Sequence, residues 1–169
     1  MYEDCIVKNV ISTEQCRELA AFFLTNSAFA KRGIRGKYSS NRLTLLCIDY
    51  ANNRTEWFDK ISDLRDRAAS VFNVCGHECF SWVSLFLPPC ELPLHVDTPV
   101  KNRIRLIVLL QRPQTGGDVV LSQHEHGEKV VLPLEVGAAY NLPAHKYFHG
   151  ISFFDCGPPR VAVGLDYLC

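Results

Sequence analysis

The chain has 169 residues, of which 47% are hydrophobic and 11% aromatic, and this size and composition suit one globular domain with a single core. Its 18 basic and 18 acidic residues leave no net charge, which disfavours nucleic acid as a partner because basic patches dominate nucleic-acid affinity. The first residues form neither a basic leader nor a long apolar run, and no membrane-length apolar stretch follows. We therefore expect a soluble cytoplasmic protein without a membrane partner, as a monomer or homodimer.

The first half of the chain predicts two helices. Ser12 and Gln15 have the spacing of a capping box, so a helix is expected to begin after Ser12 and to bury Leu19, Phe22 and Phe23. A second helix is predicted from Glu56 to Val71, where apolar residues recur at helical spacing opposite a charged face.

Two segments lie between these helices. Leu43 to Tyr50 reads as a strand. Lys31 to Asn41 is rich in Lys, Arg, Gly and Ser and is predicted to be a mobile loop.

After residue 78 the pattern changes to short β-type runs separated by Gly and Pro turn signals. The predicted strands are Phe80 to Leu87, Arg103 to Leu110, Asp118 to Ser122, Glu128 to Leu132, Ala138 to Leu142, His149 to Phe153 and Arg160 to Tyr167. Helices followed by strands predict an α+β fold, with a double-stranded β-helix core (jelly-roll, cupin-like) and N-terminal helices packed on it. With no linker or repeat, we expect a single domain over residues 1–169, comprising a helical annex with the first strand (1–79) and the jelly-roll core (80–169).

The eight cysteines are expected to stay reduced, because no secretory leader is present. Cys75 to Cys79 includes His77 and could suggest a zinc knuckle, but no second Cys/His pair has matching spacing. Buried free thiols are the favoured interpretation.

A candidate metal site lies in the stretch LPLHVDTP. If His95 and Asp97 end a strand, the period of two places both side chains on one face, where they can reach one ion. The candidates for a third ligand are His124, His126, His145 and His149. His149 stands out because it begins a β-type run after a loop.

Arg160 heads the last predicted strand. Ala162 and Gly164 follow on the same strand face and are small, so the guanidinium is expected to lie beside a space that larger side chains would fill. A planar, doubly hydrogen-bonding group beside a cavity is suited to binding a carboxylate.

In order and spacing, His95-Val96-Asp97, His149 and Arg160 resemble the motif of the Fe(II)- and 2-oxoglutarate-dependent dioxygenases. The segment Gly116-Gly117-Asp118-Val119-Val120 and the capped N-terminal helix are similar to the prolyl-hydroxylase-like branch of that superfamily. The resemblance covers residues 80–167 well and the first 79 residues loosely.

The resemblance implies that His95, Asp97 and His149 bind Fe(II) and that Arg160 holds the far carboxylate of 2-oxoglutarate. It further implies a dioxygenase that uses O2 to oxidise, most simply to hydroxylate, a C–H bond, with release of succinate and CO2. The expected substrate is a small molecule, such as an amino acid or natural-product intermediate, or a peptide side chain. The loop from Lys31 to Asn41 is expected to cover it, with His124 to Gly127 as a second candidate cover.

This sequence departs from the family pattern at two positions. Phe86 and Ala162 stand where many relatives carry hydroxyl groups that help to bind 2-oxoglutarate. The candidates to complete the grip of Arg160 are Tyr140, Thr98 and Arg105.

Two other classes remain open at this point. A cupin-type dioxygenase or isomerase without 2-oxoglutarate could use His124, His126 and Glu128 with His149, and Gly137 to Pro143 fits the last cupin motif. His124 to Glu128 is more simply an exposed hairpin turn. The third class is a catalytically silent binding module on the same fold, which would have no stoichiometric Fe(II) site.

Overall fold

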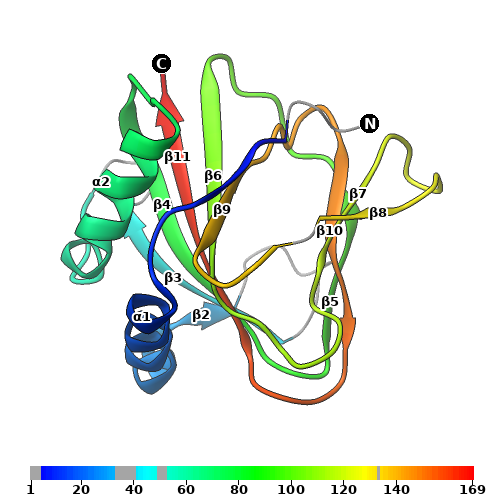
Figure 1. Cartoon of the computed structure of the whole chain (residues 1–169), viewed down its shortest axis with the longest axis horizontal. Coiled ribbons are helices and arrows are strands. Elements are labelled where there is room, and N and C mark those ends of the chain that lie inside the picture. Colours follow the sequence, from blue (N-terminus) through cyan, green and yellow to red (C-terminus); the bar gives the residue numbers. More distant parts are fainter. Residues whose placement is uncertain (1–4, 33–40, 49–52, 133) are drawn as a thin grey trace.

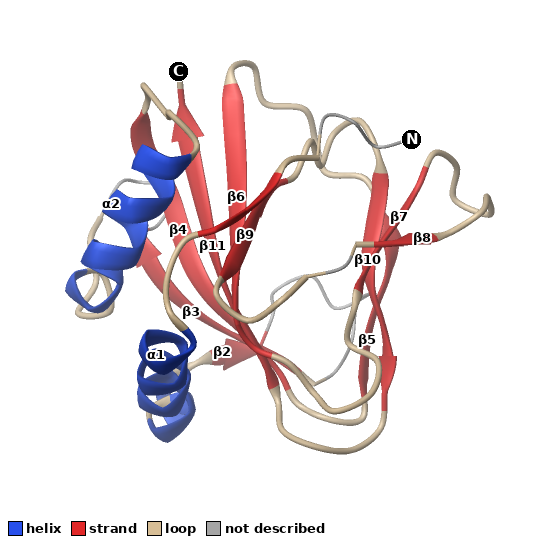
Figure 2. Cartoon of the chain, viewed as in Figure 1, coloured by secondary structure: helices blue, strands red, loops and turns tan. Residues whose placement is uncertain are grey.

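A computed structural model describes residues 5–32, 41–48, 53–132 and 134–169. Two antiparallel sheets face each other, and two helices cover the outer face of the larger sheet (Figures 1 and 2). The larger sheet has the order β1 (Val7–Asn9), β9 (Ala138–Asn141), β6 (Arg103–Gln111), β11 (Arg160–Leu168), β4 (His77–Phe86), β3 (Arg42–Ile48) and β2 (Lys31–Arg32). The smaller sheet has the order β5 (Cys90–His95), β10 (Phe148–Phe154), β7 (Val119–Ser122) and β8 (Val130–Val131). The predicted α+β fold with a jelly-roll core is confirmed.

The larger sheet separates two environments, and strand alternation decides which residues enter each. In β11, Val161, Val163 and Leu165 point into the core beneath the helices, where all three are fully buried. The alternate residues Arg160 and Ala162 line a cavity between the two sheets. The same alternation holds in β3, β4 and β6, so the inner face of the sheet carries the polar residues.

Helix α1 (Thr13–Thr25) begins as predicted, with Ser12 and Gln15 forming a complete capping box. Its buried face differs slightly from the prediction. Cys16, Ala20 and Phe23 are fully buried against the larger sheet, whereas Leu19 and Phe22 are only partly buried at its edge. The helix therefore packs on the sheet through two small residues and the Phe23 ring.

The second helix is shorter than predicted. The α-helical part is α2 (Ser62–Val71), preceded by the 3-10 turn η2 (Asp59–Ile61). Thr55 explains the late start, because its backbone N–H and its hydroxyl bond the carbonyl oxygens of Cys47 and Leu46 on β3. These bonds hold the chain extended beside the strand and delay the helix.

Other boundaries also shifted. The predicted strand from Leu43 to Tyr50 is β3, although residues 49 and 50 lie outside the described part. Most of the loop predicted from Lys31 to Asn41 likewise falls outside it, and Lys31–Arg32 forms the short strand β2. For strand β5, the sequence predicts only its end, at His95, and not where the strand begins. Its Pro93 is tolerated because β5 is an edge strand.

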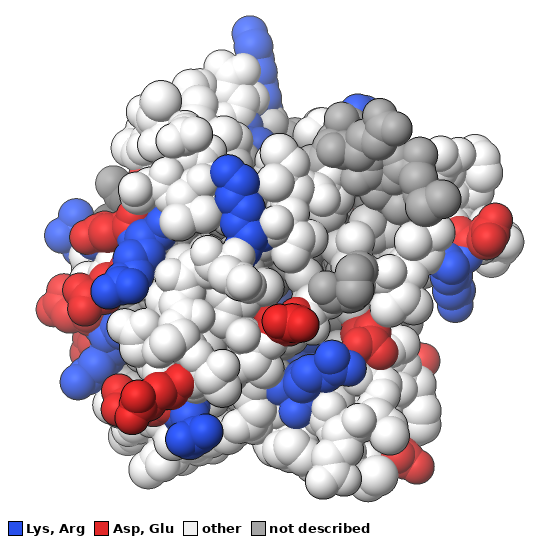
Figure 3. Space-filling model, viewed as in Figure 1, with Lys and Arg blue, Asp and Glu red and all other residues white. Residues whose placement is uncertain are grey.

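The face of the molecule drawn in Figure 3 has no strong charge asymmetry. Figure 3 shows Lys and Arg side chains interspersed with Asp and Glu, especially over the helical side of the molecule. None of the helices in the described ranges has the length and hydropathy to span a membrane. All eight cysteines are free, but Cys75, Cys156 and Cys169 are exposed, so the interpretation of buried free thiols is wrong for these three.

Candidate metal and carboxylate site

A cavity of about 540 Å³ opens between the two sheets. Strands β3, β4, β6, β9 and β11 of the larger sheet supply one wall, and β5, β7 and β10 supply the other. The jelly-roll topology thus brings residues from both ends of the sequence to one enclosed space.

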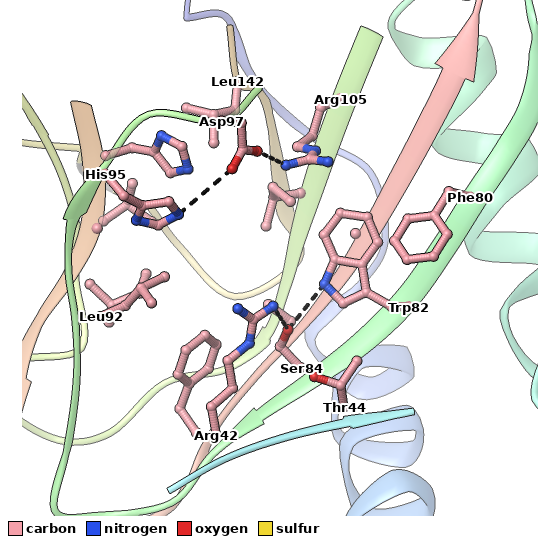
Figure 4. A pocket seen from close by; sticks show the side chains of 18 of the residues that line it. Arg42, Thr44, Phe80, Trp82, Ser84, Leu92, His95, Asp97, Arg105 and Leu142 are labelled. Atoms are coloured by element: carbon pink, nitrogen blue, oxygen red, sulfur yellow. Dashed lines mark hydrogen bonds and ion pairs between the residues drawn. The ribbon is translucent and has the colours of Figure 1, made fainter. Parts of the chain in front are cut away.

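Three potential metal ligands converge at one end of this cavity. His95 ends β5 and lies directly opposite His149 on β10, while Asp97 follows just beyond the strand. One ligand atom from each residue lies within 4.8 Å of the other two. The Asp97 backbone N–H donates to the Ala144 carbonyl oxygen at 2.8 Å, which fixes the turn after β5. Figure 4 shows the His95 ring and the Asp97 carboxylate facing each other across the site.

The backbone sets the orientation of both imidazoles. Nδ1 of His95 lies 2.9 Å from the Pro93 carbonyl oxygen, and Nδ1 of His149 lies 3.3 Å from that of Tyr147. A carbonyl accepts only from a protonated nitrogen, so these contacts favour the Nδ1–H tautomer and leave each Nε2 lone pair for a metal. Burial, and next the nearby His95, lower the pKa of His149 to about 4, so this ring is neutral near pH 7.

Gly150 permits the close approach of the two histidine strands. A β-carbon at this position would lie 2.3 Å from the Leu92 carbonyl oxygen on β5. Any other residue would push β10 away from β5, and with it His149 away from His95. This glycine directly follows the ligand that it helps to place.

Asp97 also contacts a buried ion-pair network. Arg105 Nη1 donates to Asp97 Oδ2, while Asp97 Oδ1 lies 3.8 Å from His95 Nε2. On its other side Arg105 makes two bonds of 2.7 Å to the carboxylate of Asp166, a buried residue of β11. Arg105 therefore holds one oxygen of Asp97 and leaves the other directed toward the histidines.

These residues fit a divalent iron. Two neutral imidazoles and one carboxylate are the donor set of the facial triad that binds Fe(II) in non-haem oxygenases and leaves positions open for other ligands. The carbonyl contacts of both histidines and the Arg105 contact of Asp97 supply the orienting partners that such ligands need.

Arg160 lies in the same cavity and is only 2% exposed. Its Nε donates to the Gly117 carbonyl oxygen at 2.9 Å, and its guanidinium carbon lies 5.4 Å from the centre of the Phe86 ring. Nη2 is buried without a hydrogen-bond partner among the described residues. Burial lowers the pKa of Arg160, and the nearby Tyr140 opposes that effect. A buried guanidinium with an unused donor is suited to a ligand carboxylate.

The Gly116-Gly117 turn supports this arrangement. Gly117 has φ of +68°, a left-handed conformation that disfavours other residues, and it lies just before β7. The turn directs the Gly117 carbonyl oxygen at Arg160, which orients the guanidinium.

The three residues predicted to help Arg160 bind a carboxylate differ in their positions in the structure. Tyr140 on β9 is buried and lines the same cavity as Arg160, whose pKa it raises. Burial raises the pKa of Tyr140 to about 12, so its hydroxyl stays protonated. Thr98 is exposed, with its carbonyl oxygen bonded to Arg103, and Arg105 is engaged by carboxylates at the metal end. Tyr140 is thus the candidate that the fold brings to Arg160.

The space predicted beside Arg160 is partly filled. Ala162 and Gly164 do line the cavity, but a β-carbon on Gly164 would lie 2.2 Å from the indole ring of Trp82. Trp82 comes from the neighbouring strand β4, directly opposite Gly164 in the register. The sequence reasoning overlooked this cross-strand neighbour. The Trp82 indole fills the space beside Gly164, so the open space lies beside Ala162, nearer Arg160.

The alternative histidines lie elsewhere. His124, His126 and Glu128 are exposed on the turn between β7 and β8, and His145 is also exposed. Within the described ranges, the triad is the cluster whose donor atoms could hold a metal, and neither the hairpin residues nor Cys75 to Cys79 belong to it.

Sequence reasoning also missed Arg42 on β3, a charged residue of the cavity lining. It lies on the inner face with Thr44 and Leu46, and all three line the cavity. The signal was present: extending the predicted strand back by one residue puts Arg42 in the alternation with Thr44.

Comparison with known proteins agrees on the architecture. No protein-family model and no curated protein matches the chain. Among solved structures, the chain shares its fold with prolyl hydroxylases and with a protein of the 2OG-Fe(II) oxygenase family, so the fold that the resemblance implies is confirmed.

Three of these structures illustrate the likeness. A prolyl-4-hydroxylase from Pseudomonas putida has a TM-score of 0.68 at 13% identity, over 98% of this chain and 92% of that one. A prolyl hydroxylase from Trichoplax adhaerens, in complex with a hypoxia-inducible-factor peptide fragment, has a TM-score of 0.73 at 14% identity, over 99% of this chain and 84% of that one. An oxidoreductase of the 2OG-Fe(II) oxygenase family from Burkholderia pseudomallei has a TM-score of 0.67 at 10% identity, over 97% of this chain and 84% of that one.

Proposed function

We propose that this chain is an Fe(II)- and 2-oxoglutarate-dependent dioxygenase that oxidises a C–H bond of a small molecule or peptide side chain. The observation that carries the proposal is the pairing, in one cavity, of the His95, Asp97 and His149 cluster with the buried, incompletely bonded Arg160. A metal site alone suits many functions. A metal site that shares a cavity with a buried carboxylate-binding group suits a dicarboxylate co-substrate.

The residues have distinct roles in this proposal. His95, Asp97 and His149 would hold the metal, and the Arg105 contact orients the carboxylate of Asp97. Arg160, supported by Tyr140, would bind the far carboxylate of 2-oxoglutarate. When bound, iron and the co-substrate supply the O2 chemistry that converts a C–H bond to an alcohol, with succinate and CO2 as products.

The cavity walls contribute by position and by excluding water. Leu92, Leu142 and Ile151 line the cavity near the triad, and Phe86 and Trp82 line the opposite wall. An apolar enclosure strengthens the charge-assisted bonds within it. It also keeps bulk water from the reacting groups.

The experiment measures Fe(II) content and succinate formation from 2-oxoglutarate on the same samples, against a panel of free amino acids, peptides and nucleosides. The wild-type protein is expected to bind one Fe(II) and to form succinate. Asp97→Ala is expected to lose both, and Asp155→Ala, which removes an exposed carboxylate in the turn after β10, is expected to lose neither.

Two outcomes would contradict the proposal. Absence of a stoichiometric Fe(II) site in the wild-type protein would leave the silent binding module. A bound metal with no affinity for 2-oxoglutarate would favour a cupin-type enzyme instead.

A further inference from the structure

Arg42 and Arg160 stand on either side of one phenyl ring. In the register of the larger sheet, Phe86 on β4 pairs with Arg42 on β3 and with Arg160 on β11. Each guanidinium carbon lies 5.4 Å from the centre of the Phe86 ring. Since adjacent strands lie about 4.8 Å apart, the two arginine backbones are separated by roughly 10 Å. The cavity therefore has two guanidinium groups at this end, not one.

The second position is incompletely bonded, like the first. Arg42 Nη2 donates to the Ser84 hydroxyl at 3.1 Å, and that hydroxyl also accepts from the Trp82 indole N–H at 3.1 Å (Figure 4). Arg42 Nε is buried with no hydrogen-bond partner in the described part of the chain. Burial, and next the charge of Arg105, lower the pKa of Arg42. The charge of Asp97 opposes this effect, but Asp97 forms its ion pairs with Arg103 and Arg105, so the cost of burying the Arg42 charge is only partly offset.

The carboxylates of the cavity form their ion pairs with arginines other than Arg42. Arg103 and Arg105 lie within 4.0 Å of both Asp97 and Asp166. No carboxylate of the described ranges forms an ion pair with Arg42. Under the proposed function, the two carboxylates of the co-substrate would face the metal and Arg160, and Asp97 is shared between the metal and Arg105. None of these anions pairs with Arg42, so the loaded cavity keeps an excess of positive charge to which Arg42 contributes.

We infer that Arg42 binds a carboxylate of the substrate, so the substrate class is a carboxylate-bearing molecule that enters the cavity beside Trp82. This inference rests on the proposed function and specifies its substrate. Arg42 projects into the same cavity as the His95 and Asp97 side chains (Figure 4). A substrate anchored there spans the space between Arg42 and the triad, and Trp82 and Thr44 form the adjoining wall. The carboxylate belongs either to a free amino acid or to an acidic side chain.

The test compares acids with their amides on the protein loaded with Mn(II) and 2-oxoglutarate, in which no turnover occurs. The first probes are free L-amino acids and their C-terminal amides. The second are doubly blocked aspartate and doubly blocked asparagine, which place the carboxylate on a side chain. Binding is read from Trp82 fluorescence, because Trp82 and Arg42 share the Ser84 hydroxyl. The other tryptophan, Trp57, lies in the core beyond the sheet, and a Trp82→Phe variant identifies the signal.

One acid series is expected to bind about 30-fold or more tightly than its amides, as a buried guanidinium–carboxylate contact implies. The series that binds identifies the source of the carboxylate. Arg42→Met is expected to remove the preference for acid over amide, and Arg42→Lys to restore part of it. Arg17→Met, an exposed arginine of α1, is the matched control and is expected to leave the preference intact.

The affinity for 2-oxoglutarate separates this inference from the proposed function. If the wild-type protein binds 2-oxoglutarate but shows no acid preference, or no binding of any probe at millimolar concentration, the inference about Arg42 is wrong and the proposed function stands. If Arg42→Met weakens 2-oxoglutarate binding as much as Arg160→Met does, Arg42 belongs to the co-substrate site and the inference is again overturned. The comparison of acids and amides uses the wild-type protein, so it holds even if a variant fails to fold.

Discussion

The inner face of the larger sheet has arginines at both ends, and the two ends differ in what those arginines contact. At the metal end, Arg105 binds the carboxylates of Asp97 and Asp166. At the opposite end, Arg42 and Arg160 contact hydroxyls, a carbonyl oxygen and the Phe86 ring. Each of these two retains a buried nitrogen without a partner among the described residues.

The difference indicates two uses of the same side chain. A guanidinium that is matched by carboxylates orients other groups, because its own bonding is complete. A guanidinium that is buried without an anion destabilises the empty protein, and that cost is relieved when an anionic ligand binds. The metal end is thus organised in advance, and the opposite end is organised to receive carboxylates.

The largest expected effect comes from removing the charge of Arg160. Arg160→Met keeps most of the side-chain volume but loses the contact to a carboxylate, which is worth about 2–5 kcal/mol when one partner is truncated. The 2-oxoglutarate concentration for half-maximal succinate formation is expected to rise about 30-fold or more, with Fe(II) content unchanged. Arg160→Lys should recover part of the loss. An unchanged concentration dependence in Arg160→Met would remove Arg160 from the co-substrate site.

Arg105 should affect the other end of the cavity. Arg105→Lys keeps the charge between Asp97 and Asp166 but loses the two-pronged contact with Asp166. Because partners of metal ligands typically tune affinity by about 10- to 100-fold, Fe(II) binding is expected to weaken roughly tenfold. Anaerobic Fe(II) titration measures this, and Arg103→Lys serves as control because Arg103 lies 4.0 Å from Asp97. Equal effects of the two substitutions would argue against a specific role of Arg105.

Tyr140 is expected to have a smaller effect on 2-oxoglutarate affinity than Arg160. Tyr140→Phe removes the hydroxyl that raises the pKa of Arg160 and keeps the ring, so the loss should not exceed that of one hydrogen bond, about 1 kcal/mol. The Kd of 2-oxoglutarate is expected to rise about fivefold, with metal affinity unchanged. Tyr147→Phe offers a control, since Tyr147 is only partly buried outside the cavity lining. A change in metal affinity would contradict this prediction and would indicate that Tyr140 acts on the metal site.

The smallest effect is expected at the hairpin between β7 and β8. Replacing both His124 and His126 by Ala should leave Fe(II) stoichiometry unchanged, because both side chains are exposed and lie outside the candidate cluster. Metal analysis of the purified variant tests this. Loss of the metal would instead support the cupin-type alternative.

Local patterns in the sequence determined much of this protein. The capping box at Ser12 and Gln15 placed the first helix, because its two bonds are made within four residues. Alternation placed most strands of the jelly roll, and it correctly put Arg160 and Ala162 on one inner face. The spacing of His95 and Asp97 predicted a shared ligand site, which their convergence with His149 supports.

Only the tertiary structure decided which groups meet across strands. Register sets Arg42, Phe86 and Arg160 in one row, and it lays Trp82 over Gly164. It also joins Arg105 to Asp166, although these residues are far apart in the chain. Alternation specifies the face of a strand on which a side chain lies, but it does not specify the neighbouring strand or the alignment between strands. Whether a buried arginine finds a carboxylate therefore depended on sheet order and register.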